Sequence, residues 1–149
     1  MKSQERMAFT GEVGVVDLWK SFGKRTILAG ATLSVRAGES LAIMGHSGSG
    51  KSTLLHLISG IDVPDSGSVV YGSDRGDVEV SALSARERTG IRRRHLGFVF
   101  QRDMLLPDLT AGENVALSCL LDGMTKKEAL KVAMDRLTSV GLSAYSGQR

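Results

Sequence analysis

Residues 45–53 have the types and spacing of a loop that binds phosphate groups. The segment reads Gly-His-Ser-Gly-Ser-Gly-Lys-Ser-Thr and satisfies the pattern G-x-x-x-x-G-K-[ST]. Its glycines let the backbone curl until successive N–H groups point at phosphate oxygens, an approach that larger side chains would obstruct. We therefore predict that a nucleoside triphosphate binds here, through Gly45, His46, Ser47, Gly48, Ser49, Gly50, Lys51, Ser52 and Thr53.

Four side chains of this loop have distinct predicted roles. Lys51 supplies a positive charge for the β- and γ-phosphates, and the Ser52 hydroxyl is placed to ligate Mg²⁺. Thr53 can donate a hydrogen bond to the α-phosphate, and the N-terminus of the following helix adds its dipole. His46 lies at a variable position of the pattern and reaches at most the edge of the γ-phosphate.

The loop is expected between a buried strand and a helix. The continuous apolar run at residues 41–44 suits a strand that is buried on both faces of a parallel sheet. From Lys51 onward leucines follow a helical spacing, and Gly60 is placed to end that helix. A second apolar run, at residues 96–100, predicts another strand, which ends at Gln101.

The remaining pattern predicts further strands and helices. Strands are expected at residues 13–19 and 31–35, which look antiparallel, and at 68–71, and helices are expected at 84–94, at 113–121 and from Thr125 onward. Thr125 and Glu128 form a capping-box pair at the start of the last helix. Its core-facing stripe is expected to consist of Leu130, Ala133, Met134 and Leu137.

Length, charge and cysteine content limit the class of protein. The chain has 149 residues, a net charge of +3 and one cysteine, Cys119. We expect one domain or part of one, an anionic partner such as a nucleotide, and a reducing, cytoplasmic setting without a disulfide framework. No apolar run is long enough to predict a signal peptide or a membrane span.

The motifs between residues 13 and 142 resemble those of the ATP-binding subunits of ABC transporters. The loop at 45–53, followed by two leucines, is similar to the Walker A motif of that family, and residues 96–101 are similar to its Q-loop strand. The runs Leu-Leu-Pro, Leu-Thr and Glu-Asn-Val between residues 105 and 115 are similar to the branch that serves lipoprotein release, macrolide export and cell division.

This resemblance implies a fold class and a domain organisation. The expected fold is an α/β P-loop NTPase with a RecA-like core, an antiparallel β subdomain and the start of a helical subdomain, and it is expected to be incomplete. Residues 1–149 would form the N-terminal part of one ATP-binding domain. Residues 1–101 would hold the strands, the Walker A motif and the Q-loop strand, and residues 102–149 would begin the helical subdomain.

The resemblance also implies the cofactors ATP and Mg²⁺ and two further site residues. Gln101 would contact the Mg²⁺ and the attacking water, so it is a predicted catalytic residue with Lys51 and a predicted metal-binding residue with Ser52. Phe22 lies where the family has an aromatic residue, commonly tyrosine, that stacks on adenine. Trp19 is the competing aromatic residue, which we interpret as packing within its strand.

The implied partners are transmembrane permease subunits, which would face residues 102–115, and a second ATP-binding subunit in a dimer. The chain would lie in the cytoplasm, held at the inner face of the cell membrane through the permease. No nucleic-acid partner is predicted. The basic run at 92–95 has no interleaved aromatic residues and is interpreted as a solvated helix end.

Several motifs that hydrolysis needs in this family are not found. Its signature motif, Walker B, D-loop and switch histidine should follow residues 140–142, and none of them occurs before Arg149. The run that ends in Asp17 precedes the loop and reads as an outer strand, so it is rejected as a Walker B. We expect an ATPase in the parent protein, no hydrolysis by this chain alone, and low stability from exposed apolar strand edges.

Two alternative functions stay open. One is a non-transport ATP switch or scaffold of the cell-division type, which would bind ATP to regulate a membrane partner without turnover. The other is a different P-loop enzyme, such as a kinase or a GTPase. Guanine specificity would call for an Asn-Lys-x-Asp run, which the sequence does not contain.

Overall fold

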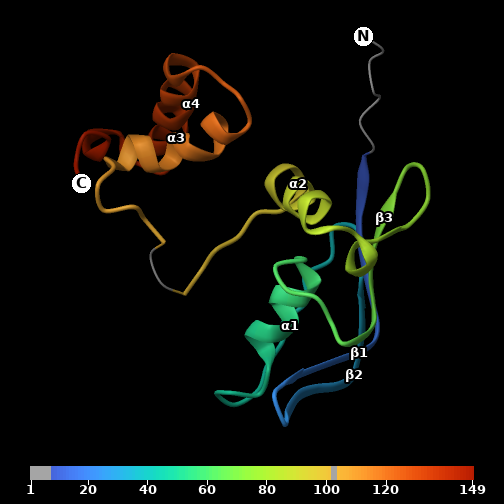
Figure 1. Cartoon of the computed structure of the whole chain (residues 1–149). Coiled ribbons are helices and arrows are strands. Elements are labelled where there is room, and N and C mark those ends of the chain that lie inside the picture. Colours follow the sequence, from blue (N-terminus) through green and yellow to red (C-terminus); the bar gives the residue numbers. More distant parts are fainter. Residues whose placement is uncertain (1–7, 102–103) are drawn as a thin grey trace. The chain divides into compact units, whose positions relative to one another are not determined.

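The computed structural model describes residues 8–101 and 104–149 and divides into two compact units, one ending at Leu96 and one beginning at Gly97. The elements of the first unit are β1 (Phe9–Phe22), β2 (Arg25–Val35), α1 (Lys51–Ile58), β3 (Ser66–Ser73), β4 (Val78–Glu79), the 3₁₀ helix η1 (Val80–Ala82) and α2 (Ala85–His95) (Figure 1). The second unit contains α3 (Ala111–Leu121), α4 (Lys126–Ser139) and the 3₁₀ helix η2 (Ser143–Tyr145).

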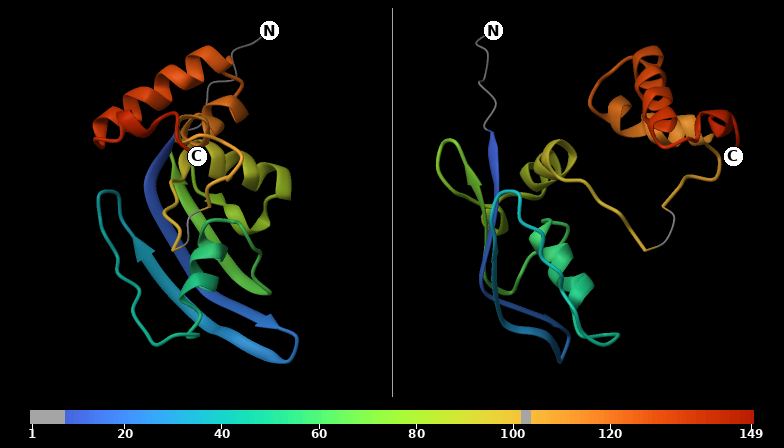
Figure 2. Two further views of the ribbon diagram at one scale, coloured as in Figure 1. Left: turned by 90° about the vertical axis from the view of Figure 1, so that its left-hand side faces the viewer. Right: turned by 180° about the vertical axis from the view of Figure 1, so that it is seen from behind.

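An antiparallel sheet with the order β2-β1-β3-β4 forms the frame of the first unit. The predicted antiparallel strands are confirmed, although β1 and β2 are longer than expected. Both α1 and α2 lie on the same face of the sheet (Figures 1 and 2). Their apolar side chains share one core with the strands, formed by Val15, Leu18, Leu28, Leu54, Leu57, Val69, Tyr71, Val80 and Ile91.

A bulge in β1 changes which of its side chains face that core. Val15 and Leu18 are both fully buried, although the alternation of an uninterrupted strand would place them on opposite faces. The register with both neighbouring strands shifts at this point, and Asp17 takes a left-handed backbone conformation with φ of 47°. The bulge therefore turns Leu18, Lys20 and Phe22 toward the face that carries α1.

Asp17 is held in this conformation by local hydrogen bonds. Its N–H donates to the Thr32 hydroxyl, and the Trp19 indole N–H donates to its carboxylate, each at 3.0 Å. Aspartate is among the few residues enriched in the left-handed region. Trp19 consequently lies on the face opposite Lys20 and is 41% exposed, so its predicted role in strand packing is only partly met.

The two apolar runs predicted as parallel strands are not strands in the structure. Residues 41–44 and 97–100 have no strand pairing, and Met44 and Val99 are fully or almost fully exposed. A strand needs a neighbour for its N–H and C=O groups. Within residues 8–101 and 104–149, the paired strands are the antiparallel ones of the sheet, and none of them pairs with these two segments.

Small residues bring the helices of the second unit together. Ala116 of α3 packs against Ala129 and Ala133 of α4, and all three side chains are buried. The predicted capping box of Thr125 and Glu128 is confirmed, and the Thr125 hydroxyl and N–H lower the pKa of Glu128. Met134 is exposed, contrary to the prediction, because the buried stripe follows Ala129, Ala133 and Leu137 at helical spacing.

The bulge should be sensitive to substitution of Gly67, which has φ of +82° and approaches β1 closely. A Cβ atom at this position would lie 2.2 Å from the Asp17 carbonyl oxygen. We expect Gly67→Ala to lower the free energy of unfolding by about 4 kcal/mol, since the backbone must move. Urea titration followed by the fluorescence of Trp19, the sole tryptophan, measures this loss.

Gly76→Ala is the matched control. Gly76 also has a positive φ, of +102°, but a Cβ atom there would meet nothing within 4 Å. Backbone strain alone should cost about 1 kcal/mol. Equal losses in the two variants would show that the contact between Gly67 and the bulge does not constrain the fold.

Candidate nucleotide-binding site

Left-handed glycines give the loop before α1 its curled path. Gly48 and Gly50 have φ of 78° and 91°. Left-handed residues that alternate with right-handed ones form concave nests of backbone N–H groups. A Cβ atom at Gly50 would lie 3.1 Å from atoms of Ile27 and Leu28. One at Gly45 would lie 2.7 Å from the Ser49 hydroxyl. The loop therefore needs glycine for its backbone conformation and for its packing.

Lys51 is the first residue of α1, and its ammonium group points back into the loop. It donates to the carbonyl oxygens of Gly45 and His46, both at 2.8 Å, and to the Ser49 hydroxyl at 3.4 Å. All three N–H donors of the ammonium are thus directed into the loop. The predicted phosphate-binding cation lies at the centre of the loop that would surround the phosphates.

A hollow of about 280 Å³ connects the loop with the β1–β2 hairpin. Phe22, at the end of β1, lines it together with glycines of the loop and the first turn of α1. Two residues that the sequence analysis did not assign, Arg25 and Ile27 of β2, also line it. The lining consists of Phe22, Arg25, Ile27, Gly48, Gly50, Lys51, Ser52 and Thr53.

The residues that line this hollow suit a nucleotide in their chemistry and in their arrangement. Glycine backbone, an ammonium and two hydroxyl groups lie on the loop side, where phosphates and Mg²⁺ would be held. An exposed aromatic ring, Phe22, lies on the hairpin side. Gly50 carries no side chain to cap α1, so the first turn of the helix keeps N–H groups for an anion. The residues present therefore fit ATP with Mg²⁺.

Two polar contacts anchor the far end of α1 to the rest of the unit. The Tyr71 hydroxyl of β3 donates to the Ile58 carbonyl at 2.5 Å, and the Arg92 guanidinium of α2 donates to the Gly60 carbonyl. The solvated face expected for the basic run 92–95 is therefore wrong for Arg92. Its side chain satisfies a carbonyl at the end of α1, whereas Arg93 and Arg94 are exposed.

The structure brings the loop residues and Phe22 into one unit, but it does not do so for Gln101. Gln101 follows the extended segment 97–100, belongs to the second unit and is exposed. Its predicted catalytic and metal-binding roles remain predictions. His46 and Ser47 are exposed at the tip of the loop. The lining roles of Arg25 and Ile27 depend on the bend of the hairpin over the loop, which sequence spacing does not encode.

The curled loop, its lysine and the hollow beside it are those of a P-loop nucleotide-binding domain. Residues 28–147 match the family model described as ABC transporter, and the chain belongs to this family. No helix in the described part of the chain is both long and apolar enough to cross a membrane.

The most similar relatives include ATP-binding proteins of lipoprotein-releasing systems. The chain is 46% identical over 127 residues to the lipoprotein-releasing system ATP-binding protein LolD of Cereibacter sphaeroides, and the match covers 85% of this chain and 55% of that protein. It is 41% identical over 126 residues to LolD of Oleidesulfovibrio alaskensis, with 85% and 53% covered. The chain thus spans about half the length of these curated relatives.

Solved ABC cassettes have the same fold. One is a dimeric structure of the ATP-binding cassette MJ0796 bound to ADP and Pi, with a TM-score of 0.80 and 34% sequence identity. The match covers 92% of this chain and 61% of that one. A second dimeric structure, of MJ0796 as a bacterial ABC transporter cassette, has a TM-score of 0.80 at 33% identity. The predicted P-loop NTPase fold class is confirmed.

The anchor between Tyr71 and α1 predicts an alkaline instability of the first unit. Burial raises the pKa of Tyr71 from 10.0 to about 12, with Arg92 acting in the opposite direction. The neutral phenol is therefore favoured in the folded state. The contribution of the neutral Tyr71 phenol to the free energy of unfolding is complete below pH 10 and should disappear as the pH rises toward 12.

Tyr71→Phe removes both the hydrogen bond and the titration. We expect this variant to be less stable than the wild type by about 1 kcal/mol at neutral pH. The difference should shrink above pH 10, because only the wild type loses a favoured neutral phenol. Urea titrations of both proteins at neutral and alkaline pH measure it, and a constant difference would contradict the role of Tyr71.

Proposed function

We propose that this chain belongs to the ATP-binding subunit of an ABC transporter, in which ATP binding and hydrolysis are coupled to lipoprotein release or transmembrane export. The observation that carries the proposal is the hollow in which the phosphate-binding loop and Phe22 meet. The similarity to ATP-binding proteins of lipoprotein-releasing systems supports lipoprotein release as the process within this family.

In this proposal each group at the hollow has one task. Backbone N–H groups of the loop and the Lys51 ammonium bind the β- and γ-phosphates, and Thr53 donates to the α-phosphate. Ser52 holds Mg²⁺. Gln101 is not among the residues that line the hollow, and its role toward the metal and the attacking water is proposed from the family resemblance alone. Bound Mg²⁺ would neutralise the charge that develops on the phosphates. Phe22 provides an aromatic face for the adenine base.

Replacement of Lys51 tests this assignment. We expect Lys51→Ala to weaken binding of a fluorescent ATP analogue with Mg²⁺ by roughly 10- to 100-fold, the equivalent of one charge-assisted contact. Lys131→Ala is the matched control, because it removes the same charge from an exposed position on α4. Equal affinity in the Lys51→Ala variant and the wild type would overturn the proposed site.

Phosphate release from the same samples separates binding from catalysis. We expect no release from this chain, because none of its residues has been assigned as the carboxylate that orients or deprotonates water. Turnover by the wild type that Lys51→Ala abolishes would show that a general base is present among these residues. An ATP-dependent interaction without turnover in the parent protein would favour the switch or scaffold over the transporter.

The proposed partners are a permease, which would hold the subunit at the cytoplasmic face of the membrane, and a second ATP-binding subunit. The solved cassettes are dimeric, which supports the second partner. An exposed apolar surface before α3, formed by Met104, Leu105 and Leu106, supports the permease as a partner, because such a surface suits contact with a protein. The Asn114 side chain holds this segment in place: its oxygen accepts from the Leu106 N–H at 2.8 Å, and its amide donates to the Leu106 carbonyl at 3.1 Å.

Binding to membranes that contain the permease tests this surface. We expect Leu105→Glu to reduce co-sedimentation at least about 10-fold, because a charge would be buried in an apolar contact. Val140→Glu is the control, since Leu105 and Val140 are both 66% exposed and only the former belongs to the proposed surface. Equal loss in both variants would assign the effect to general instability.

A further inference from the structure

Lys20 is a buried lysine at the end of β1 and is only 9% exposed. Lysine is almost never buried unless its charge is paired, because removal of an ammonium from water is costly. The bulge at Asp17 turns this side chain toward the face that carries α1. A cation in this layer therefore needs partners, and its position calls for an explanation beyond the fold of the strand.

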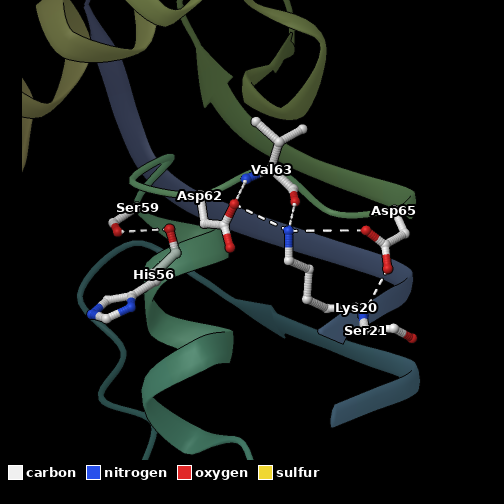
Figure 3. Close-up of polar contacts among 7 residues, drawn as sticks. All are labelled: Lys20, Ser21, His56, Ser59, Asp62, Val63 and Asp65. Carbon is white, nitrogen blue, oxygen red and sulfur yellow. Dashed lines mark hydrogen bonds and ion pairs between the residues drawn. The ribbon is translucent and has the colours of Figure 1, made fainter. Parts of the chain in front are cut away.

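The connection between α1 and β3 supplies those partners (Figure 3). The Lys20 ammonium donates to the Val63 carbonyl at 2.6 Å and to the Asp62 carboxylate at 3.1 Å, and it lies 3.9 Å from the Asp65 carboxylate. Partial burial raises the pKa of Asp62, but the Val63 N–H and Lys20 outweigh it and hold that pKa below 3.8. The Asp62 carboxyl is thus ionised at neutral pH.

Asp65 ties the same connection to β1 a second time. Its carboxylate accepts from the Ser21 N–H at 2.6 Å (Figure 3), and its own N–H donates to the Trp19 carbonyl at 2.9 Å. Backbone and side-chain bonds on both sides of Lys20 therefore hold residues 62–65 against the end of β1. This leaves the ammonium little freedom to move.

The same ammonium lies over the ring of Phe22, 5.3 Å from its centroid. This distance is within the range of a cation–π interaction. Lys20 and Phe22 are two positions apart in β1 and share a face of the strand. Phe22 lies next to the hairpin turn and is 55% exposed, so packing alone constrains its ring weakly, and it lines the hollow beside the loop.

We propose that Lys20 is a positioning residue for the nucleotide base. Its ammonium, fixed by residues 62–65, holds the Phe22 ring in one place relative to the phosphate-binding loop, so that the ring is ready to accept a base when the phosphates bind. This inference rests on the proposed function. It predicts that Lys20 contributes to the recognition of the base and not to that of the triphosphate.

Comparison of two ligands separates these contributions. Binding of MgATP and of Mg²⁺ with inorganic tripolyphosphate is measured by calorimetry for the wild type, Lys20→Met, Phe22→Ala and the double variant. We expect Lys20→Met to weaken MgATP about 5-fold, the equivalent of one cation–π contact, and to leave tripolyphosphate binding unchanged. The double variant should bind MgATP no more weakly than Phe22→Ala, because both substitutions disable the same ring.

A purely structural role for Lys20 predicts a different pattern. Lys20→Met would then weaken both ligands equally, and its effect would add to that of Phe22→Ala; either result overturns the inference. Lys20→Arg, which keeps a cation near the ring, should restore most of the preference for MgATP. If Lys20→Met does not fold, Lys20→Gln replaces it, because its amide can still donate to the Val63 carbonyl.

The failure of this inference is distinguishable from that of the proposed function. A wild type that binds neither ligand, or binding that Lys51→Ala does not weaken, overturns the nucleotide site and the inference with it. A wild type that binds both ligands through Lys51, with the preference for MgATP unchanged in Lys20→Met, overturns the role of Lys20 alone.

Discussion

The left-handed conformation of Asp17 determines which side chains of β1 meet the phosphate-loop helix. One additional residue in β1 reverses the alternation after Val15, so that Leu18 enters the core and Lys20 and Phe22 follow on the same face. Gly67 of the neighbouring strand β3 leaves room for the bulge, since a side chain there would collide with the Asp17 carbonyl. Without the bulge, Trp19 would face α1 and Phe22 would turn away from the hollow.

The layer between the sheet and α1 combines apolar packing with one buried cation. Leu54 and Leu57 of α1 pack against Leu18 and its neighbours, which supplies most of the attraction between the layers. Lys20 adds no comparable net stability, because its desolvation offsets its pairing with Asp62 and Asp65. The Lys20 ammonium instead fixes positions, because it contacts both the connection between α1 and β3 and the ring of Phe22.

The segments that were predicted as parallel strands show how a local pattern depends on its neighbours. Residues 41–44 have the composition of a strand that is buried on both faces, yet in the structure they are an unpaired part of the connection between β2 and the phosphate-binding loop. Backbone hydrogen bonds between strands come from another segment, and the pattern of one run cannot supply them. The loop itself keeps its curled path, because its glycine conformations are set locally.

The sequence by itself determined the phosphate-binding loop, the helix that begins at Lys51, the capping box of Thr125 and Glu128, and the antiparallel strands. These features depend on residue types at short spacings, where glycine conformation, capping and alternation act within a few positions. Only the tertiary structure decided that Arg25 and Ile27 line the hollow beside the loop, that Arg92 anchors α1, and that Lys20 is buried against residues 62–65. The physical reason is that each of these placements depends on a contact between segments far apart in the chain. The contact between Gly67 and the Asp17 bulge is one such case, and a periodic pattern within one strand carries no information about it.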